Sequence, residues 1–158
     1  MKYLVAVLAL GLSLCAQAGI EEGQQAYIVG EYDKAIAEFK PLAEQGDAKA
    51  QYFMGFLYHH GYGMKVNEVE AAKWFRMGAN QGEWQSQYYL GVIYEKGVGI
   101  PKDLATAHMW LSLAATNPGT TFRDSLHTKE AIGKLEHKMN PEQIAQAKDM
   151  AKNWKPQN

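Results

Sequence analysis

The chain has 158 residues, with 16 Lys and Arg against 17 Asp and Glu, so its formal net charge is −1. It has no basic block that could neutralise a phosphate backbone, which argues against nucleic-acid binding. Hydrophobic residues make up 47% of the sequence, including four Trp and nine Tyr, and this supports one packed domain.

Residues 1–18 have the pattern of a secretory signal peptide. Lys2 is followed by an uncharged apolar run and then by small residues ending at Ala18, so we predict cleavage before Gly19. The apolar run is shorter than the roughly 20 residues that a membrane-spanning helix needs, and no later run reaches that length. The predicted mature protein therefore has no membrane span and is periplasmic or secreted.

A lipoprotein signal is the alternative interpretation of this segment. It would end at Cys15, but bacterial lipoprotein signals place a small residue before the cysteine, and this chain has Leu14 there. We therefore favour simple cleavage. Because Cys15 is the only cysteine in the sequence, the cleaved protein would have neither disulfides nor thiol chemistry.

Two consecutive segments, 48–83 and 84–119, repeat one pattern at a constant offset of 36 residues (84 − 48 = 36). The identical pairs are Gln51/Gln87, Tyr52/Tyr88, Gly55/Gly91, Tyr58/Tyr94, Gly61/Gly97, Gly63/Gly99, Ala71/Ala107, Trp74/Trp110 and Ala79/Ala115. A period of this size is typical of a solenoid, whose units bury their apolar faces only by stacking on one another.

Each segment is expected to form two helices. In 48–83, apolar residues recur at helical spacing up to a turn at Gly61 and Gly63, and again on a second helix from Ala71 to Ala79. In 84–119 the second helix is predicted to begin after Asp103, which is a suitable N-cap residue. The aromatic residues that we assign to the core are Tyr58, Trp74, Tyr94 and Trp110.

These residues resemble the SEL-one-like repeat family, a relative of the tetratricopeptide repeats. The family pattern is Gly-x-x-Tyr-x-x-Gly-x-Gly, a loop, Ala-x-x-Trp and a closing Ala-x-x-Gly. The segment 48–83 matches throughout, closing at Gly82, whereas Pro118 replaces the closing glycine in 84–119. The resemblance implies an all-α fold: an α/α superhelix, or solenoid, of about four antiparallel helix pairs after the signal peptide.

Weaker similarity extends to both sides, so the predicted repeat domain covers 19–158. A shorter tetratricopeptide-like unit is expected over 19–47. After the repeats, 120–158 is expected to form a C-terminal capping hairpin. The second helix of this hairpin is predicted to begin with a cap at Asn140 and a proline in its first turn.

The residues that could carry chemistry form weak patterns. His59 and His60 are neighbours on one helix and point about 100° apart, so they do not share a metal without help from another element. Asp124, His127 and Glu130 are spaced three apart, but the polar face of a capping helix gives the same pattern. The sequence has no Ser-x-x-Lys or Gly-x-Ser-x-Gly motif. We therefore predict no catalytic residues, no metal and no cofactor.

The resemblance implies that the first helix of each unit lines a concave groove for a partner. The groove positions are Tyr52, Phe56, His59, His60, Tyr88, Val92, Glu95 and Lys96. Tyrosine suits recognition because it offers a large ring and a hydrogen-bonding hydroxyl at low entropic cost. The alternative is that Tyr52 and Tyr88, which are identical in the two repeats, are packing residues.

The resemblance thus implies a non-catalytic scaffold or adaptor of the bacterial cell envelope that binds a protein or peptide. An alternative is a β-lactam- or cell-wall-binding protein with weak hydrolase activity, as associated with some secreted relatives. Those relatives carry a disulfide in each repeat, and this chain does not. Self-association through an open end of the helical stack is a further hypothesis.

Overall fold

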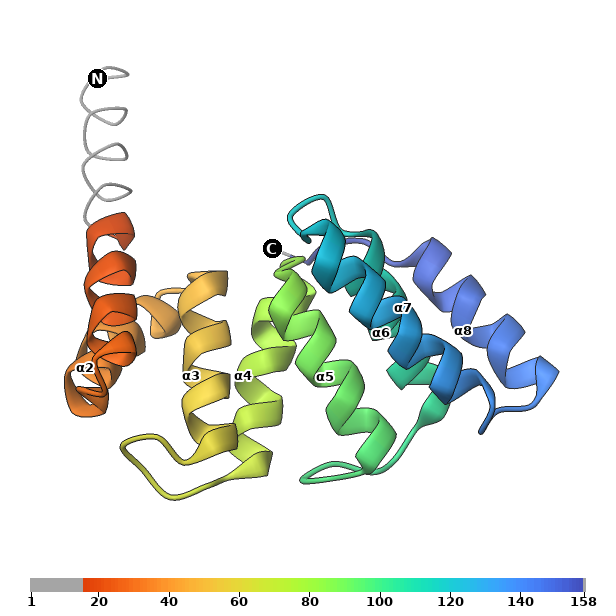
Figure 1. The fold of residues 1–158 in the computed structure, drawn as a ribbon, viewed down its shortest axis with the longest axis horizontal. Helices are drawn as coiled ribbons and strands as arrows, with labels where there is room; N and C mark the ends of the chain where they lie inside the picture. The colour runs from red at the N-terminus through yellow and green to blue at the C-terminus, as the bar shows by residue number, and fades with distance from the viewer. Residues whose placement is uncertain (1–15, 158) are drawn as a thin grey trace, which may run out of the picture.

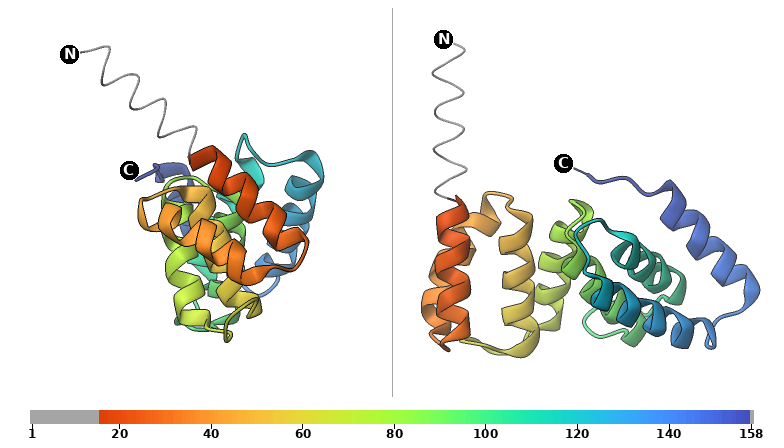
Figure 2. Two further views of the ribbon diagram at one scale, coloured as in Figure 1. Left: turned by 90° about the vertical axis from the view of Figure 1, so that its left-hand side faces the viewer. Right: turned by 45° about the horizontal axis from the view of Figure 1, so that its top comes forward.

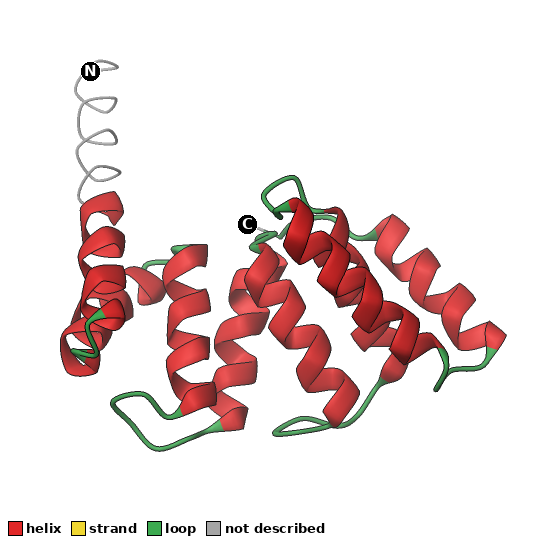
Figure 3. Cartoon of the chain, in the orientation of Figure 1, coloured by secondary structure: helices red, strands yellow, loops and turns green. Residues whose placement is uncertain are grey.

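The computed structural model describes residues 16–157, which form eight helices and no strand (Figures 1 and 3). The first described helix covers residues 16–28, so the predicted cleavage site before Gly19 falls inside it. The alternative lipidation site, Cys15, lies outside the described residues. The other helices are α2 (Tyr32–Glu44), α3 (Ala48–His60), α4 (Glu68–Asn80), α5 (Trp84–Lys96), α6 (Leu104–Thr116), α7 (Phe122–Glu136) and α8 (Pro141–Asn153).

Each helix from α2 to α6 packs on the next helix along the chain, which confirms the predicted helical solenoid. The starts and ends of the repeat helices follow from the sequence. Asp47 caps α3 by accepting a hydrogen bond from the Ala50 amide at 2.8 Å, and Asp103 caps α6 as predicted. Gly61 and Gly97 end α3 and α5 in the left-handed region, each with a φ of 71°.

Glycines inside the helices allow neighbouring helices to approach closely. A Cβ atom at Gly55 of α3 would lie 2.7 Å from the Phe75 ring of α4. At the equivalent position, a Cβ atom at Gly91 of α5 would lie 2.7 Å from Cγ of Leu111 on α6. Both repeats therefore use one packing scheme, in which a large side chain of the second helix occupies the space over a glycine of the first.

The core is a series of apolar clusters along the stack. Its fully buried large residues include Phe39, Leu57, Phe75, Leu90, Leu111 and Leu135. Of the predicted core aromatics, Trp110 is buried, and Tyr58, Trp74 and Tyr94 are half-buried against the same clusters. Burying one such large apolar side chain contributes roughly 1.5–3 kcal/mol, so the shared interior holds the units together.

The C-terminal helices pack differently from a repeat unit. Both α7 and α8 pack mainly against α6, whereas the two helices of the expected hairpin would pack mainly against each other. Trp154, just after α8, lies against Trp110 of α6 with ring centroids 5.9 Å apart. The Gln157 amide then donates a hydrogen bond to the Asn80 carbonyl at 2.7 Å, so the tail returns to the middle of the array (Figure 2). Met150, Ala151 and Trp154 thus pack on the apolar cluster that contains Trp110, while α8 itself lies against α6.

No helix within residues 16–157 has the length and apolar character needed to cross a membrane.

Candidate binding surface

Aromatic side chains from α3 and α5 meet on one side of the array. On α3, the Phe56 ring lies 5.9 Å from Tyr52 and 4.3 Å from His60, measured between ring centroids. On α5, Tyr89 lies 5.6 Å from Phe56 and 6.1 Å from Tyr52. Four-residue spacing on α3 places Tyr52, Phe56 and His60 on one helix face, and the stacking of the repeats brings Tyr89 to it.

Two further tyrosines extend this surface. Tyr27 of the first helix meets Phe56 edge to face, with centroids 5.7 Å apart and an interplanar angle of 86°. Tyr62, in the turn after α3, stacks on His60 at 5.4 Å and 19°. We define the aromatic surface as Tyr27, Tyr52, Phe56, His60, Tyr62 and Tyr89, all of which are at least partly exposed. Aromatic pairs of these geometries contribute about 0.5–1.5 kcal/mol each, so the rings of this surface stabilise one another.

A pocket adjoins the aromatic surface where α3, α5 and the first part of α7 meet. It has a volume of about 250 Å³, and we call it the aromatic pocket. Its lining residues are Tyr52, Trp84, Gln85, Tyr88, Tyr89, Asp124, His127 and Thr128. The Tyr88 hydroxyl lies 3.3 Å from Nε2 of His127, which ties α5 to α7 across the pocket. Helix α7 thus forms one wall of the pocket.

Burial perturbs the phenols at this site. The pKa of Tyr89 is raised to about 12, mainly by desolvation and next by the nearby Tyr88. Desolvation also raises the pKa of Tyr52, with the nearby Tyr89 as the next cause. Both hydroxyls therefore remain neutral near pH 7 and are available as hydrogen-bond donors.

The residues predicted from the resemblance separate into two groups. Four of the eight lie on the aromatic surface or line its pocket, namely Tyr52, Phe56, His60 and Tyr88. His59 instead pairs with Glu68, and its Nδ1 lies 2.7 Å from Oε2 of that residue. The other three lie apart from the pocket lining. Val92 packs on the cluster around Leu111, Glu95 pairs with Lys138 at 2.7 Å, and Lys96 is exposed at the end of α5.

Sequence reasoning missed several residues of this site. Tyr89 occupies the column of Phe53, 36 residues earlier, and this shared aromatic character was the available signal (89 − 53 = 36). Asp124 and His127 were considered only as possible metal ligands or as part of the polar face of a capping helix. The structure instead places both in the pocket lining, and residues 16–157 contain no cluster of three or more His, Cys, Asp or Glu side chains arranged to hold a metal.

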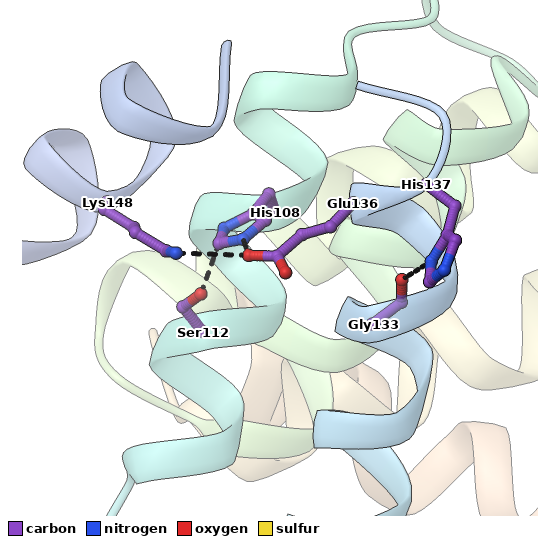
Figure 4. Close-up of polar contacts among 6 residues, drawn as sticks. All are labelled: His108, Ser112, Gly133, Glu136, His137 and Lys148. Carbon is purple, nitrogen blue, oxygen red and sulfur yellow. Dashed lines mark hydrogen bonds and ion pairs between the residues drawn. The ribbon is translucent and has the colours of Figure 1, made fainter. Parts of the chain in front are cut away.

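A second polar group lies between α6, α7 and α8 (Figure 4). His108 is 1% exposed, and its Nε2 lies 2.9 Å from Oε1 of Glu136. Its Nδ1 lies 3.2 Å from the Ser112 hydroxyl, and Lys148 of α8 reaches the same Glu136 oxygen at 3.3 Å. The hydrogen bond from His108 holds the pKa of Glu136 below its usual range. Because one carboxylate receives groups from both α6 and α8, we interpret this network as a link between the C-terminal helices.

The comparisons with known proteins agree with this architecture. The Sel1 repeat family matches residues 48–83 and 84–118, which are the α3–α4 and α5–α6 units. The chain therefore contains two Sel1 repeats, and Sel1 repeats generally mediate protein interactions. Proteins of this family are typically non-enzymatic scaffolds. A search among curated protein sequences found no significant match.

Two solved structures are similar over most of the chain. One is a protective antigen of uropathogenic Escherichia coli strains that displays an SLR fold, with a TM-score of 0.80 and 30% sequence identity over 88% of this chain. This chain spans 29% of the length of that antigen. The other is a Sel1 repeat protein from Oxalobacter formigenes, with a TM-score of 0.63 and 27% identity over 82% of this chain and 99% of that one.

Proposed function

We propose that this protein is a non-catalytic adaptor of the bacterial cell envelope that binds a protein or peptide segment on its aromatic surface. The observation that carries the proposal is the continuous set of partly exposed rings from Tyr27 to Tyr89, bordered by the aromatic pocket. Rigid aromatic side chains supply contact area at low entropic cost and are enriched at binding hot spots.

The cell-envelope location is supported by the signal-like pattern of residues 1–18 and by the description of one structural neighbour as a protective antigen. The alternative of β-lactam binding gains no support from the comparisons. The secreted relatives that suggest this alternative carry a disulfide in each repeat, whereas this chain has a single cysteine.

The proposal is tested by capturing partners from an envelope extract with the purified protein. Tyr52 packs against two core clusters, so its truncation would disturb folding as well as binding. A better test is the double variant Gln85→Lys/Tyr88→Ala, which alters side chains lining the pocket. The matched control is Lys73→Ala/Met77→Ala on α4, where both side chains are exposed.

We expect the pocket variant to lose the captured protein while the α4 variant retains it. Both variants should keep the helical circular dichroism signal. The pocket variant should unfold at a somewhat lower midpoint, because Tyr88 packs on the cluster around Leu111, but it should be folded at the temperature of the capture experiment. Equal recovery of the partner by the folded pocket variant would contradict the proposed binding surface.

A further inference from the structure

The lining of the aromatic pocket has an unusual chemical composition. Four of its eight residues are Tyr or Trp, namely Tyr52, Trp84, Tyr88 and Tyr89, and His127 adds an imidazole ring. One carboxylate, that of Asp124, lies among them, and the lining contains neither Lys nor Arg. Aromatic faces carry negative potential, so rings and a carboxylate together favour a cation.

The ring geometry is that of walls rather than of a flat stack. Tyr88 and Tyr89 lie at an interplanar angle of 89° with centroids 5.6 Å apart. Tyr89 and Tyr52 are inclined at 41° with centroids 6.1 Å apart. Rings set at such angles can contact a bound group from more than one side, as in the aromatic cages that recognise cationic groups.

The Asp124 carboxylate is held in place but not neutralised. Its Oδ2 accepts a hydrogen bond from the Thr121 hydroxyl at 2.6 Å, at the start of α7. Within residues 16–157, Asp124 has no ion-pair partner. A partly buried carboxylate beside apolar rings is a favourable counter-ion for an incoming cation, because little screening water separates the two.

We propose that the aromatic pocket binds an arginine side chain of the partner. This inference rests on the proposed function, since it assigns the chemistry of one anchor residue on the bound segment. Arginine suits the pocket because its planar guanidinium stacks on aromatic faces and pairs with a carboxylate through two donors. Its long side chain also reaches into a pocket of about 250 Å³.

The test uses small probes and the full chain, so the partner need not be known. Nα-acetyl-arginine methylamide is titrated into ¹⁵N-labelled protein, and the indole N–H signal of Trp84 is followed by NMR. The matched probe is the citrulline derivative, which has nearly the same shape as arginine but no charge. The matched variants are Asp124→Asn and Asp149→Asn; Asp149 is an exposed acid on α8.

We expect saturable shifts at Trp84 with the arginine probe and none with the citrulline probe. Asp124→Asn should weaken binding by about three- to fivefold, the effect of losing one partly exposed charge contact. Asp149→Asn should leave the affinity unchanged. Absence of shifts with arginine, equal shifts with citrulline, or equal weakening by the two Asp variants would overturn the inference.

These outcomes also separate this inference from the proposed function. In one outcome, the protein does not bind the arginine probe but captures a partner that Gln85→Lys/Tyr88→Ala loses. That result would support the binding surface and contradict the arginine site. A protein that binds the probe but captures no partner supports the pocket chemistry alone.

Discussion

Gly91 shows how much the packing of the repeats depends on a single missing side chain. A Cβ atom added there would lie 2.7 Å from Leu111 Cγ and 3.1 Å from the Ala107 carbonyl oxygen, both on α6. The carbonyl belongs to the backbone, so a rotamer change cannot relieve that contact. Glycine is needed at position 91 of this chain because α5 and α6 pack at this distance.

Gly91→Ala is expected to destabilise the protein by about 1–3 kcal/mol, the usual cost of overpacking a filled interior. The control is Gly133→Ala on α7, where an added Cβ meets no atom within 4 Å. That change should stabilise the protein by roughly 0.5–1 kcal/mol through helix propensity. Urea unfolding of both variants measures these values. A neutral or stabilising effect of Gly91→Ala would contradict the close approach of α5 and α6.

The phenol of Tyr89 makes the free energy of unfolding depend on pH in the alkaline range. Its pKa in the folded protein is raised to about 12, chiefly by desolvation, whereas an unfolded tyrosine ionises near pH 10. The stabilisation is therefore complete below about pH 10 and is lost as the pH rises toward 12, because only the unfolded chain gives up its proton in that interval.

We accordingly expect the free energy of unfolding to fall between pH 9 and pH 11, and to fall less steeply in Tyr89→Phe. Urea unfolding at the two pH values checks this, with Tyr32→Phe as the control tyrosine in α2. The same pH dependence in Tyr89→Phe and the unaltered protein would show that the phenol of Tyr89 does not contribute to the loss of stability.

At the residue scale, the sequence predicted the positions that recur and missed those that depend on a neighbouring helix. Gly55, Gly91 and Trp110 recur because packing requires them, and the structure uses them in packing. The pocket role of Asp124 could not be predicted, because it depends on how α7 docks beside α5. That docking is not encoded in any repeat column.

At the element scale, the link among α6, α7 and α8 depends on Glu136. Its carboxylate accepts from the buried His108 and also pairs with Lys148. Its pKa is held low by the His108 hydrogen bond, so the carboxylate is ionised at neutral pH and can serve both groups. Loss of this side chain would leave the buried imidazole nitrogen without its acceptor.

Glu136→Ala should therefore cost about 1–3 kcal/mol, the penalty of an unsatisfied buried polar group. The matched control, Glu130→Ala, removes an exposed acid on the same helix that pairs with Lys134, and it should leave the stability nearly unchanged because exposed ion pairs contribute little. Hydrogen exchange should rise in α8 with the first variant and not with the second. Unchanged exchange in α8 would show that the network does not hold this helix.

The sequence predicted the helices of this region but not their packing. Asn140 caps α8 with the expected capping box, because capping depends on local spacing alone. Whether α8 pairs with α7 or with α6 depends on which apolar faces remain uncovered after the repeats have stacked. Met150, Ala151 and Trp154 pack on the cluster that contains Trp110. The packing partner of α8 therefore could not be predicted from the sequence alone.

At the scale of the whole molecule, the stack separates two sides with different roles. Large side chains of the second helices, such as Phe75 and Leu111, fill the shared interior, and α8 packs on α6. The first helices leave a continuous row of aromatic rings accessible on the other side. The architecture therefore commits one side to stability and offers the other for binding.

The most direct test of this division is site-specific photocrosslinking in living cells. A photoreactive amino acid is placed singly at His60 or Gln85 on the aromatic side, and at Lys73 or Met77 on α4, all of which have accessible side chains. We predict that His60 and Gln85 become joined to one and the same protein and that the α4 positions do not. Adducts formed from Lys73 or Met77, with none from His60 and Gln85, would contradict the account.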